Sequence, residues 1–306
     1  MKPVRSVRQF ALRFAIVFAL SVAAAGVVTP VFAAQATPAA PFASDRLSVE
    51  VRGQGPDVIF VPGYTSSREV WNETAERLAA THRVHLVQFS GFAGQAWSHG
   101  DGPFLAPALD ELARYAGTLD KPALIGHSMG GFAGLRLAQQ HPDLLSKVMS
   151  VDSLPFFGAL MGPQATPENL VPIANQTKAM LLAVSPEMFR AQQAQTAVGM
   201  TLTEAKRTAI IEDSMKSDPQ ARATAIAELM VADARADLGK VSVPFWAVYA
   251  VDHSGGQGAL ATAMWTREYA ALPDVKLEAV ENSRHFIMYD QPERLNALID
   301  AFLASD

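Results

Sequence analysis

Apolar and polar positions follow two alternating periods between residues 47 and 153. Short apolar runs closed by glycine, proline, serine or aspartate predict strands at 57–63, 82–91, 121–128 and 145–153. Between them, apolar residues recur at helical spacing and predict helices at 66–80, 104–119 and 129–142. Residues 47–55 alternate and then turn, which is typical of an outer antiparallel strand. This order predicts an α/β fold with a doubly wound, mostly parallel sheet.

The alternation stops between residues 154 and 240. Only helical periodicity is found there, with predicted helices at 168–184, 185–200, 203–216 and 218–238. The strand–helix order then resumes, with strands at 241–252 and 275–283 and helices at 259–272 and 291–304. An all-helical block inside such a series predicts a lid inserted between two core strands. The expected domains are a first core part at 45–153, a helical lid at 154–240 and a second core part at 241–306.

Residues 1–33 have the pattern of a secretory signal peptide. A basic start is formed by Lys2, Arg5, Arg8 and Arg13. A long apolar run follows, and Val31 and Ala33 occupy the −3 and −1 positions of a small-residue cleavage site. We therefore expect cleavage near Ala33, export to the periplasm or the medium, and a disordered lead-in at 34–44.

An uncleaved amino-terminal anchor is the alternative, because the apolar run is nearly long enough to span a bilayer. Ser21, Gly26 and Pro30 weaken the run as a lasting helix and favour cleavage, with no stable membrane insertion afterwards.

Charge and composition narrow the chemistry. Without residues 1–33 the chain keeps 21 basic and 30 acidic residues, a formal charge of −9, which argues against nucleic acid and anionic membranes as partners. The chain has no cysteine, so thiol nucleophiles and cysteine-ligated metals are excluded. No zinc-protease, phosphate-loop or dinucleotide motif is present. We expect a small-molecule substrate and neither a metal nor an organic cofactor.

The stretch "ALIGHSMGG" at 123–131 carries the strongest chemical signal. Its G-x-S-x-G pattern directly follows an apolar strand and opens a helix, which is typical of a nucleophile elbow holding Ser128. Glycine is needed on both sides because the backbones approach closely. Two N–H donors are expected for an oxyanion, one from Met129 and one from Tyr64 in the loop after the strand "DVIFVPG".

A serine nucleophile needs a base, and His285 is the preferred candidate among seven histidines. It follows the last predicted strand, in a loop at the sheet edge where ligands bind. The others are His82, His85, His99, His127, His141 and His253. His82 and His85 lie in or before an early strand, His141 ends a helix, and His127 lies within the elbow. His99 and His253 lie in loops, and His99 stays open as a substrate contact.

The base needs an orienting carboxylate, and two aspartates satisfy the chain order serine, acid, histidine. Asp152 ends the strand "KVMSVD", and Asp252 ends the strand "PFWAVYAVD". Both stand at the same edge of the predicted sheet.

Together these residues resemble the α/β-hydrolase family over residues 45–306, and most closely its esterase, lactonase and perhydrolase-like members with a helical lid. The resemblance favours Asp252, because most members carry the acid on the strand after the lid, and keeps Asp152 as the alternative. The chain departs from the family pattern in "PG" for "HG" before the oxyanion loop and in "YAVD" for "GxxD".

The resemblance implies a Ser128–His285–Asp252 triad that cleaves an ester or related acyl bond through an acyl-enzyme. Cleavage of amide or carbon–carbon bonds by the same residues, or ligand binding without catalysis, are the alternatives. Methionines in the lid favour an apolar acyl pocket without a charged anchor, with Met180 and Met188 as candidate wall residues.

Overall fold

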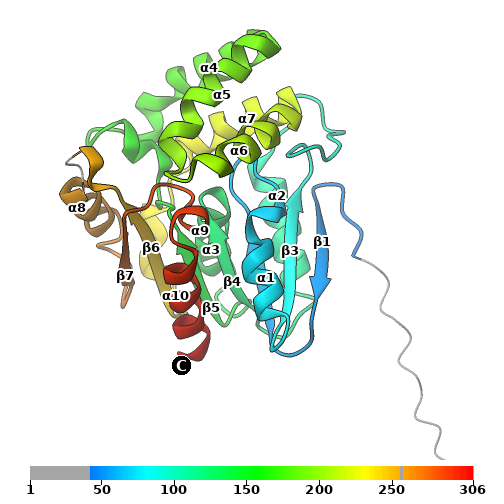
Figure 1. Ribbon diagram of the computed structural model, residues 1–306, viewed down its shortest axis with the longest axis vertical. Coiled ribbons are helices and arrows are strands. Elements are labelled where there is room, and N and C mark those ends of the chain that lie inside the picture. Colours follow the sequence, from blue (N-terminus) through cyan, green and yellow to red (C-terminus); the bar gives the residue numbers. More distant parts are fainter. Residues whose placement is uncertain (1–41, 256–257, 306) are drawn as a thin grey trace, which may run out of the picture. The chain divides into compact units, whose positions relative to one another are not determined.

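The computed structural model describes residues 42–255 and 258–305, which contain a seven-stranded sheet in the order β1-β3-β2-β4-β5-β6-β7 (Figure 1). The strands are β1 (Leu47–Arg52), β2 (Asp57–Val61), β3 (Arg83–Phe89), β4 (Ala123–His127), β5 (Lys147–Val151), β6 (Phe245–Val251) and β7 (Lys276–Glu281). β1 pairs antiparallel with β3, and all other pairs are parallel. The predicted outer antiparallel strand and the mostly parallel sheet are confirmed. The expected signal peptide at 1–33 lies outside the described residues.

Helices cover both faces of the sheet because side chains alternate along each strand. Ile59 and Val61 of β2 face one apolar core with α2 (Leu105–Ala116), α3 (Met129–Gln140) and α8 (Gly258–Glu268). Val58 and Phe60 face a second core with α1 (Asn72–Leu78) and α10 (Pro292–Ala304). The buried strands therefore read as continuous apolar runs, which is why the sequence located them.

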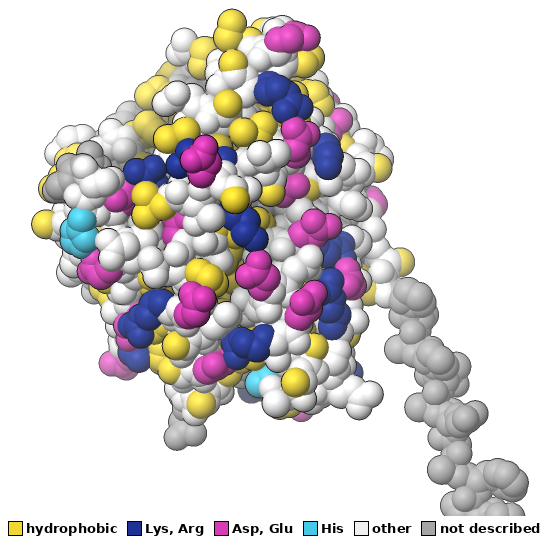
Figure 2. Space-filling model, viewed as in Figure 1, with side chains coloured by type: hydrophobic (Ala, Val, Ile, Leu, Met, Phe, Trp, Pro, Cys, Tyr) yellow, Lys and Arg dark blue, Asp and Glu magenta, His cyan; other side chains and the backbone are white. Residues whose placement is uncertain are grey.

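The segment between β5 and β6, residues 154–240, is called here the helical insert. Its α-helices are α4 (Pro167–Ala183), α5 (Pro186–Met200), α6 (Glu204–Lys216) and α7 (Pro219–Val231), and they lie above the upper end of the sheet in Figure 1. Apolar side chains are visible at the surface in this upper region (Figure 2). Among the described helices, none is both long and apolar enough to cross a bilayer.

The predicted helix at 218–238 is shorter than expected. α7 ends at Val231, because Asp233 forms a β-bridge with Phe156 and the Ala234 amide donates to the Pro155 carbonyl at 2.9 Å. This contact with the entry of the insert could not be read from local periodicity. The sequence also did not predict the short helix α9 (Ile287–Asp290).

Parallel pairing brings the carboxyl ends of the strands to one edge. Val61 of β2 is in register with Gly126 of β4, and His127 of β4 is in register with Val151 of β5. The residues that follow β2, β4, β5 and β7 therefore gather beneath the helical insert. This edge is where ligands bind in open parallel sheets.

Candidate active site

Ser128 sits on a strained turn between β4 and α3. Its φ is 53° and its ψ is −119°, a conformation that non-glycine residues rarely adopt. A side chain at Gly126 would place its Cβ 2.1 Å from the Gly130 carbonyl oxygen, so glycine is required there. The Ser128 amide donates to the Val151 carbonyl at 2.9 Å and ties the turn to β5. The backbone therefore has the sharp strand-to-helix turn that a nucleophile elbow requires.

The carboxylate that contacts His285 belongs to Asp152. The distance between His285 Nδ1 and Asp152 Oδ2 is 2.7 Å. Asp152 directly follows β5 with a φ of 47°, and its Oδ1 accepts the Ala250 amide at 2.9 Å. Its own amide donates to the Val248 carbonyl at 2.7 Å. Two bonds to β6 therefore hold the aspartate so that one oxygen faces the histidine.

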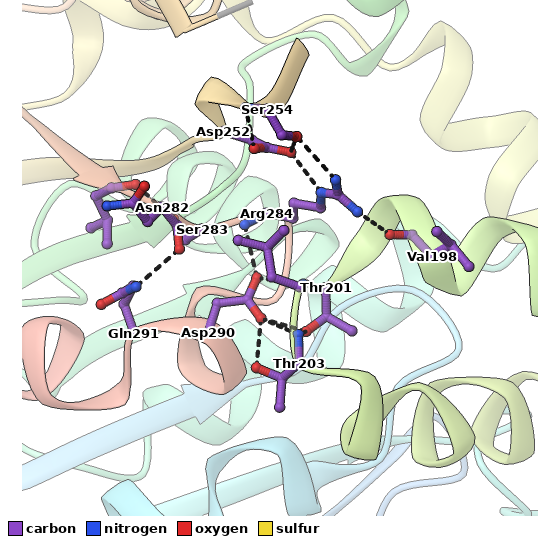
Figure 3. Close-up of polar contacts among 12 residues, drawn as sticks. Val198, Thr201, Thr203, Asp252, Ser254, Asn282, Ser283, Arg284, Asp290 and Gln291 are labelled. Carbon is purple, nitrogen blue, oxygen red and sulfur yellow. Dashed lines mark hydrogen bonds and ion pairs between the residues drawn. The ribbon is translucent and has the colours of Figure 1, made fainter.

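Asp252 faces a different partner. Its carboxylate accepts Arg284 Nε at 2.7 Å, the Ser254 amide at 2.8 Å and the Ser254 hydroxyl at 2.8 Å (Figure 3). The Ser254 amide, followed by the Arg284 side chain, lowers the pKa of Asp252 to about 2. The expectation that Asp252 contacts His285 is therefore corrected in favour of Asp152, because Arg284 and Ser254 occupy the Asp252 carboxylate.

Met129 and Tyr64, whose amides are the expected oxyanion donors, both lie in the same pocket as Ser128. Met129 is the first residue of α3, and the first amides of a helix have no partner within the helix. A Cβ at Gly63 would lie 3.0 Å from Ser128 Cβ, so the loop leading to Tyr64 passes directly beside the serine. The Tyr64 hydroxyl donates to the Arg222 carbonyl at 3.0 Å and fixes that loop against α7.

His127 is a site residue that the sequence treated only as part of the elbow. Its side chain is fully buried, and its Nε2 lies 2.9 Å from the His285 carbonyl oxygen. The ring centroids of the two histidines are 4.5 Å apart. Burial, and then the neighbouring His285, hold the pKa of His127 well below 6.5, so the ring is neutral and Nε2 is the donor. Its position directly before the nucleophile was the available signal.

A cavity of about 400 Å³ joins these residues. Ser128, Met129, Asp152, Tyr64 and His285 all line it. The apolar part of the wall consists of Phe132, Leu154, Phe157, Leu160, Met200, Ile210, Ile226, Leu229, Trp265 and Phe286. Among the described residues no lysine, arginine or glutamate lines the cavity, and Asp152 is its only aspartate. The wall is mostly apolar, as the methionine-rich insert predicts.

Two methionines expected at the wall lie elsewhere. Met180 and Met188 are each 57% exposed and do not line the cavity, whereas Met200 at the end of α5 does. Helical periodicity did not reveal which side of α4 and α5 faces the serine.

The remaining polar candidates have other surroundings. His99 Nε2 lies 3.3 Å from the Asp45 carbonyl oxygen and outside the cavity wall, so the structure does not support it as a substrate contact. His253 pairs with Glu281 at the surface. In the part of the chain that the structure describes, no group of three or more His, Asp or Glu side chains could hold a metal ion.

Known proteins resemble this chain in sequence and in fold. A family model described as "Alpha/beta hydrolase family" matches residues 58–298. Two proteins named pimeloyl-[acyl-carrier protein] methyl ester esterase are similar in sequence. The one from Vibrio atlanticus is 28% identical over 67% of this chain and 80% of the relative. The one from Vibrio cholerae is 30% identical over 65% of this chain and 77% of the relative.

Solved structures share the fold at low sequence identity. An enol-lactonase from Burkholderia xenovorans aligns with a TM-score of 0.66 and 15% identity, covering 85% of this chain and 96% of the other. A thermophilic esterase from Thermogutta terrifontis aligns with a TM-score of 0.66 and 20% identity, covering 84% and 92%.

Proposed function

Because the chain belongs to the alpha/beta hydrolase family, we propose that it is a serine hydrolase that cleaves an ester bond of a small, largely apolar substrate. The observation that carries the proposal is the 2.7 Å contact between His285 Nδ1 and Asp152 Oδ2, in the same cavity as the strained Ser128. The sequence relatives are named as methyl ester esterases, which supports ester chemistry.

The proposed reaction has two halves. Ser128 Oγ attacks the ester carbonyl carbon while His285 Nε2 takes the hydroxyl proton. The Met129 and Tyr64 amides stabilise the negative charge that develops on the carbonyl oxygen. The tetrahedral species collapses, the leaving alcohol takes the proton from His285, and an acyl-serine remains. Water, deprotonated by His285, then releases the acid and restores the serine.

Asp152 sets the protonation pattern that this reaction needs. By accepting a hydrogen bond from His285 Nδ1–H, Asp152 leaves Nε2 unprotonated and free to act as the base, and it stabilises the imidazolium that forms. The helical insert supplies several of the apolar cavity residues, which suits a hydrophobic acyl group and a role as a lid.

Active-site labelling tests the proposal. The protein is treated with a fluorophosphonate, and the adduct is mapped by peptide mass spectrometry. We expect an adduct on Ser128, none in Ser128→Ala, and an unchanged adduct in Ser153→Ala, which alters a neighbouring serine of the same cavity. Hydrolysis of p-nitrophenyl butyrate should fall by about 10³-fold or more in Ser128→Ala. A chain with no labelled serine and no esterase activity would favour a ligand-binding protein without catalysis.

A further inference from the structure

The loop that carries His285 is bonded to the helical insert on both sides of the histidine. We propose that Arg284 and Asp290 are positioning residues, which hold His285 in its reactive place by fastening residues 284–290 to residues 198–203 at the end of α5. This inference rests on the proposed function and adds residues to it that do not touch the substrate.

Arg284 forms the first half of this connection. Its Nη1 donates to the Val198 carbonyl near the end of α5, and its Nε donates to Asp252 at 2.7 Å (Figure 3). Its Nη2 lies 3.3 Å from the Ser254 hydroxyl. Because Arg284 directly precedes His285, its guanidinium connects the loop of His285 to the insert and to the segment after β6. Asp252 therefore binds this arginine, whereas the His285 ring contacts Asp152.

Asp290 forms the second half. Its Oδ1 accepts the Thr201 hydroxyl at 2.6 Å and the Thr203 amide at 3.0 Å. Its Oδ2 accepts the Leu202 amide at 3.0 Å. The same oxygen accepts the Arg284 amide at 2.9 Å (Figure 3). Burial alone would raise the pKa of Asp290, but these hydrogen bonds lower it overall, so the carboxylate stays charged. A single side chain thus bonds both segments.

Backbone contact places the histidine between these two anchors. The Phe286 amide donates to the Met200 carbonyl at 2.9 Å, one residue after His285. Met200 also lines the cavity. The segment that lines the cavity at Met200 is therefore also the segment that supports the loop of His285, and a shift of α5 would move both. Misplacement of a reacting group by about 1 Å can cost about 10²-fold in rate.

The Arg284–Asp252 pair is expected to affect rate more than stability. The two side chains are 22% and 26% exposed, and ion pairs in contact with solvent contribute little to protein stability. Arg77→Gln is a matched control, because Arg77 on α1 pairs with Asp300 at the same 2.7 Å and does not line the cavity.

The test compares Arg284→Gln, Arg284→Lys, Asp290→Asn and Arg77→Gln, all in the full chain. For p-nitrophenyl butyrate we expect kcat to fall about 10- to 100-fold in Arg284→Gln and Asp290→Asn, with KM changed less than about threefold. Arg284→Lys should recover part of kcat, because it keeps a charged donor. Arg77→Gln should keep wild-type kcat while its Tm changes by as much as that of Arg284→Gln.

Hydrogen exchange gives a readout that does not depend on activity. Arg284→Gln should speed exchange at both 284–290 and 200–203, and Arg77→Gln should change neither. Wild-type kcat in Arg284→Gln and Asp290→Asn would overturn the positioning role while leaving the proposed esterase intact. An inactive wild-type protein would instead refute the proposed function. Unchanged exchange in Arg284→Gln would show that the two segments do not depend on the arginine.

Discussion

Ser128 and Asp152, which both line the cavity, adopt positive φ angles without being glycine. Ser128 has a φ of 53° and Asp152 a φ of 47°, and they directly follow the adjacent strands β4 and β5. Each such conformation costs about 1–3 kcal/mol and persists only where the surroundings impose it. Here the Ser128 amide bonds β5 and the Asp152 amide bonds β6. The same strain therefore directs a hydroxyl and a carboxylate toward one cavity.

The first prediction concerns the acid. Asp152→Asn should lower kcat by about 10³- to 10⁴-fold, because an amide can hold the wrong tautomer of His285. Asp252→Asn should cost no more than about 10²-fold, because it only loosens Arg284. Both variants are compared on one p-nitrophenyl ester at saturating substrate. A larger loss in Asp252→Asn would return the role of the acid to Asp252.

Sequence alone could not decide between these aspartates. Each directly follows a buried strand, so both are delivered to the same edge of the sheet. What separates them is the direction of the side chain, which depends on the positive φ of Asp152 and on the partner of Asp252. The arginine next to His285 was the one local hint that Asp252 had another partner. The serine and the histidine were recognisable because motif and chain position identify them.

The second prediction concerns His127 and pH. The folded chain keeps this buried ring neutral, whereas the unfolded chain protonates it below about 6.5. Because the unfolded state then binds more protons, the free energy of unfolding falls as the pH drops below 6.5, by at most about 1.4 kcal/mol per pH unit for one group. His127→Gln lacks this proton site, so its stability should fall less between pH 7 and pH 5. Urea unfolding of both proteins across that range measures the difference, and parallel pH profiles would contradict it.

At the scale of elements, the strands were predictable and the orientation of the insert was not. A buried parallel strand must be apolar on both faces, which leaves an unmistakable run such as 57–61. Met180 of α4 is exposed to solvent and Met200 of α5 lines the cavity, but both fall in helical apolar patterns and are indistinguishable by spacing. Only packing against the core decides which of them meets the cavity.

The third prediction uses that difference. Met200→Ala should enlarge the cavity and move the kcat/KM optimum toward longer acyl chains, because Met200 lines the wall. Met180→Ala makes the same change on an exposed side chain and should leave the profile unchanged. The measurement is kcat/KM for p-nitrophenyl esters from C2 to C12. An unchanged profile in Met200→Ala with a lowered Tm would mean that this side chain only packs.

At the scale of the whole molecule, the core and the insert divide the work. The core strands bring Ser128, Asp152 and His285, the proposed catalytic residues, to one edge, and the insert covers that edge with apolar side chains. The contacts of residues 198–203 with residues 284–290 connect the two parts at the base itself. A substrate that displaces α5 would therefore change the position of His285 as well as the shape of the cavity.

The last prediction concerns residues 1–33, which lie outside the described structure. Their basic start, apolar run and small residues at Val31 and Ala33 lead us to propose a cleaved secretory signal peptide. The chain is expressed with its own amino terminus in a bacterial host, and the envelope fraction is analysed by intact-mass and peptide mass spectrometry. We expect a mature chain that begins at Ala34 or within a few residues of it. A control with Ala33→Leu should slow cleavage, because a large residue at −1 fits the small-residue site poorly. Recovery of the full-length wild-type chain from the membrane would instead support the uncleaved anchor, and recovery from the cytoplasm would refute export.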